Sequence, residues 1–178
     1  EEAAGEVLHK ALATACGSVV PGGAVYAASP AGTTLPVLIG AFKGTGFNFK
    51  WSLVWVKDQF VLGRSDYHFR HEVILYGWKD GAHYFADDRT QDSVFEVSRP
   101  RANDQHPTMK PVELIARMVQ NSRRPGDAVY DPFAGSGSTL LACEQLGRAA
   151  RLMEINEAYA SVILTRFESA TGEQAVRL

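Results

Sequence analysis

The stretch Asp131-Pro132-Phe133-Ala134-Gly135-Ser136-Gly137-Ser138-Thr139 decides the fold class of this 178-residue chain. The residues before it, 128–130, form a short apolar segment that predicts a buried strand. The residues after it, 140–146, favour a helix and run into Gly147, a residue type that often ends helices. The two glycines therefore lie in a loop between a strand and a helix.

A second apolar segment, residues 149–153, predicts a strand that places Glu154 at its carboxyl end. Glycines let a ligand approach the backbone closely, and a carboxylate about 20 residues after such a loop accepts hydrogen bonds from ribose hydroxyls. The order strand, glycine loop, helix, strand and carboxylate therefore predicts a βαβ unit that binds a nucleoside.

The loop sequence also distinguishes between nucleoside ligands. A dinucleotide-binding loop has a third glycine where this chain has Leu140, and a phosphate-binding P-loop has a lysine that Gly137-Ser138-Thr139 lacks. Asp131 at the start of the loop repels a pyrophosphate and attracts a cation. S-adenosylmethionine carries an ammonium and a sulfonium group but no phosphate, so the charge pattern favours S-adenosylmethionine.

The glycine-loop stretch, preceded by His106-Pro107-Thr108-Met109-Lys110-Pro111, resembles the amino-group DNA methyltransferases, which modify adenine N6 or cytosine N4. More narrowly, the chain is similar to the phage- and prophage-type enzymes of the β arrangement. Residues 20–26, 53–57 and 67–79 resemble the strands that follow the catalytic motif of that family. The resemblance covers nearly the whole chain. It implies an α/β, Rossmann-like S-adenosylmethionine-dependent methyltransferase fold, with a mostly parallel sheet, helices on both faces and a permuted order.

Periodicity and turn residues predict the other elements. Helices are expected at residues 6–16, 34–43, 110–121 and 157–169, and strands at 24–28, 51–57 and 72–78. Residues 82–85 and 94–97 are expected to form a small excursion around the polar turn 87–92. Threonines are expected to cap the helix at 34–43, and Gly44 to end it.

We expect one methyltransferase domain over residues 1–178. Its substrate and catalytic half is residues 1–79, its cofactor-binding half is residues 106–178, and the short segment 80–105 is a linker or recognition segment. That segment is short and acidic, which excludes a large DNA-reading domain within it.

The resemblance implies a set of S-adenosylmethionine contacts: His106, Thr108, Lys110, Asp131, Pro132, Phe133, Ala134, Gly135, Ser136, Gly137, Glu154 and Ile155. Asp131 is expected at the charged methionine portion, Glu154 at the ribose hydroxyls and Ile155 beside the adenine ring. Alternatives remain open. Asp131 fits a turn-stabilising carboxylate, Glu154 a solvated strand end, and the segment 106–111 a plain helix cap with an exposed lysine.

Arg64, Tyr67, His68 and Arg70 lie in a loop between two predicted strands, and we predict that they bind DNA. Aromatic rings stack on bases, and arginines contact phosphates. The alternative is that Tyr67 anchors the loop to the core and the histidine forms local hydrogen bonds. His71-Glu72 lacks a second histidine one helical turn away, so no metal site is expected.

The catalytic signature of the family, Pro-Pro followed by an aromatic residue, does not occur in this sequence. We expect it upstream of residue 1, which makes the sequence a piece of a longer protein. The alternative is a degenerate, inactive relative that binds S-adenosylmethionine or DNA as a partner subunit. No residue of this chain is therefore assigned as catalytic.

The resemblance implies direct methyl transfer to a flipped base within double-stranded DNA, as in restriction–modification systems. Adenine N6 is favoured over cytosine N4 by resemblance alone, and RNA or a protein amine is the alternative substrate. The absence of a Pro-Cys dipeptide argues against the cytosine-C5 route, which needs a cysteine nucleophile.

Bulk composition adds limits. A net charge of −2 means that DNA affinity must come from local basic surfaces. Cys16 and Cys143 lie far apart among small apolar residues, which favours buried free thiols in a reducing cytosol. The sequence has no apolar run of membrane-spanning length and no signal pattern, so we expect a soluble, cytoplasmic protein.

Overall fold

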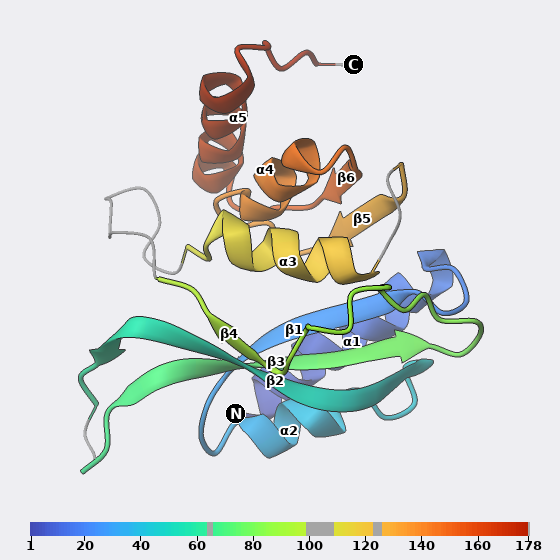
Figure 1. Cartoon of the computed structure of the whole chain (residues 1–178), viewed down its shortest axis with the longest axis vertical. Helices are drawn as coiled ribbons and strands as arrows, with labels where there is room; N and C mark the ends of the chain where they lie inside the picture. Colours follow the sequence, from blue (N-terminus) through green and yellow to red (C-terminus); the bar gives the residue numbers. More distant parts are fainter. Residues whose placement is uncertain (64–65, 99–108, 123–125, 178) are drawn as a thin grey trace. The chain divides into compact units, whose positions relative to one another are not determined.

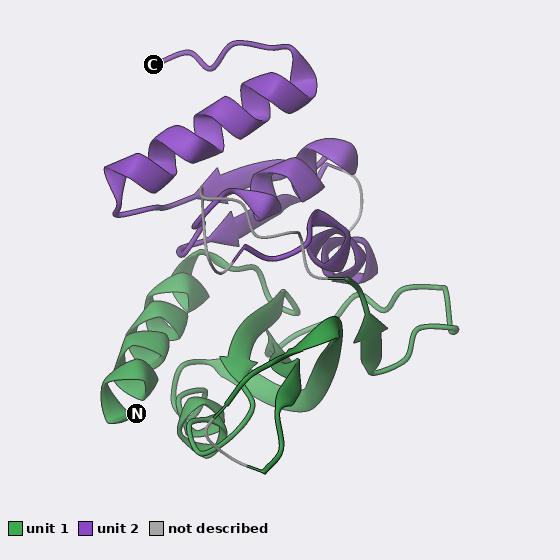
Figure 2. Ribbon diagram, turned by 90° about the vertical axis from the view of Figure 1, so that its left-hand side faces the viewer, with its two compact units in different colours: residues 1–98 green, residues 99–178 purple. Residues whose placement is uncertain are grey.

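The computed structural model describes residues 1–63, 66–98, 109–122 and 126–177 of the chain. The chain forms two compact units, Glu1–Ser98 and Arg99–Leu178, coloured green and purple in Figure 2. Unit 1 contains α1 (Glu2–Ser18), β1 (Ala24–Pro30), α2 (Leu35–Gly40), β2 (Phe47–Val61), β3 (Phe69–Lys79) and β4 (Val94–Glu96). Unit 2 contains α3 (Val112–Ser122), β5 (Ala128–Asp131), α4 (Ser138–Gln145), β6 (Ala149–Leu152) and α5 (Glu157–Thr171).

The sheet of unit 1 has the strand order β1-β3-β2-β4 (Figure 1). β3 pairs antiparallel with both β1 and β2, whereas β2 and β4 pair in parallel. The predicted strand at 51–57 is longer in the structure because β2 and β3 form a hairpin, and the ladder continues beyond irregularities at Phe49/Trp51 and Val56/Val61.

The core of unit 1 lies between one face of this sheet and the helices α1 and α2. Val73 and Leu75 of β3 point to this face because side chains two residues apart share one side of a strand. They pack with Leu12 of α1, Leu38 of α2 and Phe42, which are all buried. Apolar burial on one sheet face therefore holds this unit together.

Unit 2 contains the predicted βαβ unit. β5 and β6 pair in parallel, with Asp131 opposite Leu152, and α4 connects them. Leu114 and Met118 of α3 are buried. The predicted order of strand, loop, helix and strand is confirmed, but the strands are not buried as expected. No residue of β5 or β6 is fully buried, because the ladder described in this unit consists of these two short strands.

One further detail differs from the sequence-based expectations. The described ladders are not mostly parallel: two are antiparallel, because β2 and β3 form a hairpin and β3 lies between β1 and β2. Residues 82–85 form no strand. Instead, His83 stacks on Trp78 with ring centroids 4.2 Å apart and hydrogen-bonds to the Tyr76 hydroxyl and the Gly22 carbonyl oxygen.

The capping prediction for α2 is wrong. Thr34 stands at the N-cap position in a helical conformation and makes no capping hydrogen bond with its side chain, whereas capping residues normally adopt an extended conformation. The Thr33 hydroxyl instead donates to the Glu1 carboxylate at 2.6 Å. The helix ends at Gly40, and turns continue to Gly44.

Candidate functional site

The loop between β5 and α4 is shaped by two glycines. Gly135 (φ 56°) and Gly137 (φ 80°) both have left-handed conformations, which other residues adopt only with strain. The Gly137 N–H donates to the Ala134 carbonyl oxygen at 2.9 Å and closes a tight turn. A Cβ atom at Gly137 would stand 2.9 Å from the Ile163 side chain of α5, so this position also lacks space for a side chain.

Asp131, the last residue of β5, holds the start of this loop. Its Oδ1 accepts a hydrogen bond from the Phe133 N–H at 2.9 Å, and its Oδ2 accepts one from the Thr139 hydroxyl at 2.5 Å. These contacts are those of a turn-stabilising carboxylate, the alternative that the sequence left open. Because a carboxylate has about four acceptor positions, the same side chain retains capacity for a ligand.

Glu154 lies against the glycine loop, as its position after β6 predicts. Its Oε2 accepts a hydrogen bond from the Gly135 N–H at 2.8 Å, and its Oε1 accepts one from the Asn156 N–H at 2.9 Å. The backbone supports this arrangement, since the Ala134 N–H donates to the Met153 carbonyl oxygen at 3.0 Å. Two carboxylates from the ends of neighbouring parallel strands therefore contact the same loop.

Exposed apolar side chains lie next to these carboxylates in the sequence. Phe133 is 60% exposed and Ile155 is fully exposed, although large apolar side chains are usually buried. Met153, also exposed, accepts a hydrogen bond on its sulfur from the Tyr130 hydroxyl at 3.1 Å. Together with the acids, these side chains give the loop region both charge and apolar surface.

Arg166 of α5 is a residue that sequence analysis missed. Its Nη1 donates to the carbonyl oxygen of Ser136 and, at 3.0 Å, to the Ser136 hydroxyl oxygen. Burial lowers the pKa of the guanidinium. Thr139 and Met153 were likewise not assigned. Thr139 belongs to the stretch that was singled out, and its position in the first turn of the helix was the available signal.

The segment before α3 contributes a backbone contact. The Ser138 hydroxyl donates to the Lys110 carbonyl oxygen at 2.7 Å, which ties the start of α4 to the residue two positions before α3. The backbone of Lys110 therefore lies beside the start of α4. His106 and Thr108, the other two predicted contacts in this segment, lie outside the described residues.

Three of the predicted DNA-binding residues, Tyr67, His68 and Arg70, belong to the β2–β3 hairpin, whose described part extends beyond the helices of unit 1 (Figure 1). Tyr67 is 83% exposed. His68 stacks on Phe60 with ring centroids 5.3 Å apart and accepts a hydrogen bond from the Gly63 N–H at 3.3 Å. Arg70 is exposed, and Arg64 lies outside the described residues.

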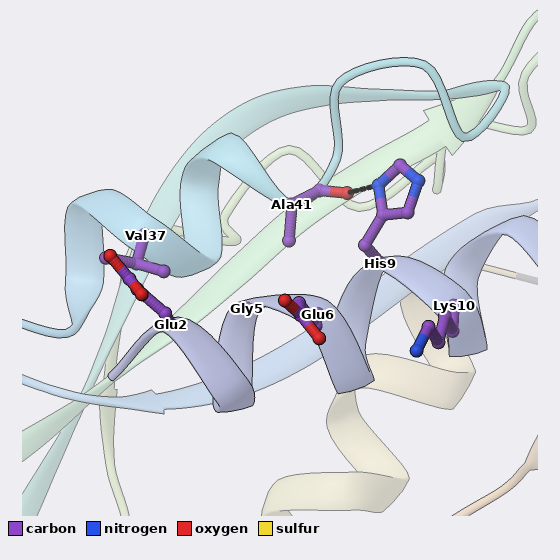
Figure 3. Close-up of a pocket in the computed structure, with 7 residues that line it drawn as sticks. All are labelled: Glu2, Gly5, Glu6, His9, Lys10, Val37 and Ala41. Atoms are coloured by element: carbon purple, nitrogen blue, oxygen red, sulfur yellow. Dashed lines mark hydrogen bonds between the residues drawn. The ribbon is translucent and has the colours of Figure 1, made fainter.

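Two surface hollows in unit 1 lie away from the glycine loop in the sequence. One, between α1 and α2, is lined by Val37, Ala41 and α1 side chains, and His9 hydrogen-bonds across it to the Ala41 carbonyl oxygen at 3.0 Å (Figure 3). The other is polar and is lined by Arg70 and Lys57 together with the acids Asp58 and Glu96. Neither hollow contains a residue assigned to the cofactor.

The sequence also made predictions about the two cysteines, about metal binding and about membrane-spanning segments. Both cysteines are free thiols; Cys143 is buried and Cys16 is half-buried. Burial raises the pKa of the Cys143 thiol to about 11. Among the residues described, no group of three or more His, Cys, Asp or Glu side chains is arranged to hold a metal ion. Within the same residues, no helix is long and apolar enough to cross a membrane.

Comparison with known proteins identifies relatives over most of the chain. The DNA adenine methyltransferase YhdJ of Escherichia coli (strain K12) is 30% identical over 154 residues, which cover 78% of this chain and 51% of that protein. The type II methyltransferase M2.DpnII of Streptococcus pneumoniae is 27% identical over 146 residues, which cover 72% of this chain and 54% of that protein. The chain spans about half the length of these two curated relatives.

The fold has a close counterpart among solved structures. The crystal structure of the M1.HpyAVI–SAM complex superposes with a TM-score of 0.78 at 24% sequence identity, covering 88% of this chain and 80% of that one. This confirms the predicted methyltransferase fold class. A family model described as DNA methylase (N6_N4_Mtase) matches residues 9–165. The chain therefore belongs to the N6/N4 DNA methylase family.

Proposed function

We propose that this chain is part of a site-specific DNA methyltransferase that transfers a methyl group from S-adenosylmethionine to an exocyclic amino group of a base. Adenine N6 is the preferred target, because the curated relatives include an adenine methyltransferase, and cytosine N4 is the second candidate. Type II relatives favour a restriction–modification context.

The observation that carries this proposal is the convergence of Asp131 and Glu154 on one glycine loop. A ligand there meets two carboxylates, and residues 131–139 contain no lysine or arginine to neutralise a phosphate. This environment suits a cationic nucleoside and disfavours a nucleotide. The residues present therefore fit S-adenosylmethionine, which supplies a methyl group on a positively charged sulfur.

Each loop residue then has a distinct role. Asp131 attracts the charged methionine portion, directly or through water, while Thr139 keeps its carboxylate oriented. Glu154 accepts hydrogen bonds from the ribose hydroxyls, since a carboxylate can accept several hydrogen bonds at once. Phe133 and Ile155 cover the adenine ring, which would explain why such large apolar side chains are exposed.

The backbone of the loop completes the proposed site. Pro132, Ala134, Gly135, Ser136 and Gly137 form a turn with two left-handed residues, so the chain passes close to the ligand without intervening side chains at the glycines. His106, Thr108 and Lys110 are proposed to border the methionine end.

For the substrate, we propose that double-stranded DNA contacts the β2–β3 hairpin through Arg64, Tyr67, His68 and Arg70. The exposure of Tyr67 and the extension of the hairpin support stacking of this ring against bases next to a flipped target. Asp58 and Glu96 share a hollow with Arg70, and Lys57 in the same hollow is paired with Glu72. The two acids reduce the attraction of Arg70 for phosphate, so Arg70 is expected to contribute modestly.

We further propose that residues 1–178 act as a single methyltransferase domain in the cytoplasm, with residues 1–79 on the substrate side and 106–178 on the cofactor side. No Pro-Pro dipeptide occurs in the sequence, so no residue here is proposed to hold the target amino group. The second candidate function, a partner subunit that binds S-adenosylmethionine without methylating, follows from that same absence.

The proposal is tested with S-adenosylmethionine carrying a labelled methyl group, incubated with duplex DNA, with RNA and with a protein mixture. Incorporation into DNA alone supports the DNA methyltransferase. Incorporation into RNA or protein overturns the substrate assignment. Binding of the cofactor without incorporation into any of them supports the non-methylating subunit for this chain.

A further inference from the structure

We infer that Arg166 of α5 is a positioning residue for the cofactor loop: it fixes the conformation of residues 134–137 without itself touching the ligand. The inference rests on the proposed function, since the loop must first be a cofactor loop. It adds a residue that lies 30 positions from the loop residue it contacts.

The first support is the placement of the guanidinium. Arg166 is partly buried, and burial of a charged group is unfavourable unless hydrogen bonds or an opposite charge compensate. Within the described part of the chain, no carboxylate stands within ion-pair distance of Arg166. Its compensation comes instead from Ser136, through both the carbonyl and the hydroxyl oxygen. The burial of this charge is thus coupled to the conformation of the loop.

The second support is the peptide group that Arg166 contacts. The Ser136 carbonyl belongs to the same peptide as the Gly137 N–H, and that N–H donates to the Ala134 carbonyl oxygen to close the turn. A charged donor on the carbonyl polarises the peptide and strengthens the hydrogen bond that its N–H makes. Arg166 therefore reinforces the turn at its closing bond.

The third support is a second contact from the same helix face. Ile163 lies three residues before Arg166, so the two side chains share one face of α5. Ile163 is buried and occupies the space that a Cβ atom at Gly137 would need. Arg166 fixes the loop by hydrogen bonds to Ser136. Ile163 fixes it by filling the space beside Gly137.

The simplest alternative is direct ligand binding by Arg166, through the carboxylate of the methionine portion. The Arg166 Nη1 instead donates to Ser136, to both its carbonyl oxygen and its hydroxyl oxygen. The expected effect of Arg166 on affinity is therefore indirect, through the geometry that it gives to the loop.

The test compares Arg166→Met, which keeps the aliphatic stem, with Arg166→Lys, which keeps a charge and a donor. Arg151→Met is the matched control, because Arg151 is an exposed arginine on β6 of the same unit. Binding of S-adenosylhomocysteine is measured by calorimetry, and amide hydrogen exchange of residues 134–137 is measured without ligand. Thermal melting shows that each variant is folded.

We expect Arg166→Met to weaken binding about tenfold and to accelerate exchange in the loop, consistent with the loss of a charge-assisted hydrogen bond. Arg166→Lys should recover part of both effects, and Arg151→Met should match the wild type. If Arg166→Met does not fold, Arg166→Lys alone decides: intermediate binding and exchange support the inference, and wild-type values for both overturn it.

The two readouts separate this inference from the proposed function. If the folded wild type does not bind S-adenosylhomocysteine, the cofactor assignment fails for this chain. Amide hydrogen exchange of residues 134–137 then still tests whether Arg166 orders the loop. Faster exchange in Arg166→Met would keep Arg166 as the residue that orders the loop. Unchanged exchange, or unchanged affinity in a wild type that binds, would overturn the inference.

Discussion

The apolar core of unit 1 and the glycine loop of unit 2 are held by different forces. In unit 1, Leu75 is fully buried and packs with Phe42 and Leu38 behind the sheet. In unit 2, the strands that carry the loop have no fully buried residue, and the backbone N–H groups of the loop donate hydrogen bonds to side-chain carboxylates. Burial stabilises the first region, and oriented polar contacts shape the second.

This difference has a consequence for mutation. Apolar burial is non-directional and approximately proportional to area, so changes in the unit 1 core should alter stability. Hydrogen bonds add little net stability but specify geometry, so changes at the loop should alter ligand affinity more than unfolding. All three tryptophans lie in unit 1, which makes their fluorescence a direct report on that unit.

The largest expected effect is that of Leu75→Ala. Removing a fully buried leucine side chain from a packed core costs about 3 kcal/mol, the sum of lost transfer free energy and the remaining cavity. Urea unfolding followed by tryptophan fluorescence measures the change. Leu62→Ala, at an exposed leucine of the same unit, should change the free energy of unfolding by less than about 0.5 kcal/mol. Equal effects of the two would contradict the assigned core.

Glu72→Gln should have the next largest effect, because it breaks the ion pair between Glu72 and the buried Lys57. The Lys57 ammonium is 2.7 Å from the Glu72 carboxylate, and the Lys57 side chain is only 8% exposed. Removing the partner leaves a buried charge; since Glu72 is partly exposed, we expect a loss of about 2 kcal/mol rather than more. Glu96→Gln, at an exposed acid on β4, is the control. A loss from the control as large as that from Glu72→Gln would contradict this account.

The sequence predicted the regions where one local pattern determines the structure. Glycine spacing and apolar segments located β5, the loop, α4 and β6, and placed Glu154 at the loop. The contacts of Arg166 and Lys57 were not predicted, because each depends on residues far apart in the chain. The failed cap at Thr34 has the same origin, since tertiary contacts override weak local preference.

Cys143 predicts a pH dependence of the free energy of unfolding. This residue lies on α4, the helix that follows the glycine loop. Burial raises the pKa of its thiol from 9.0 to about 11, so the folded state holds this proton more tightly than the unfolded state. The associated stability is fully present below pH 9 and is lost as pH rises towards 11, by up to about 2 kcal/mol. Unfolding followed by circular dichroism from pH 8 to 11 should show this loss of stability. The variant Cys143→Ala should lack the part of the loss that the thiol causes. An identical pH dependence in wild type and Cys143→Ala would contradict the assignment to Cys143.

The smallest effects are expected at the β2–β3 hairpin. Arg70→Ala should weaken DNA binding about threefold and reduce the salt slope by roughly one, whereas Tyr67→Ala should weaken it without changing that slope. Fluorescence anisotropy with duplex DNA at several salt concentrations measures both. Lys43→Ala, at an exposed lysine outside the hairpin, is the control. A change of salt slope in the control but not in Arg70→Ala would argue that DNA contacts another surface.

The most direct test of the cofactor assignment is calorimetric titration of the chain with S-adenosylhomocysteine, alongside NAD⁺ and ATP. The account predicts binding of S-adenosylhomocysteine alone, weakened about tenfold or more by Glu154→Gln and unchanged by Glu144→Gln at an exposed glutamate of α4. Preference for NAD⁺ or ATP, or equal affinity in wild type and Glu154→Gln, would contradict it.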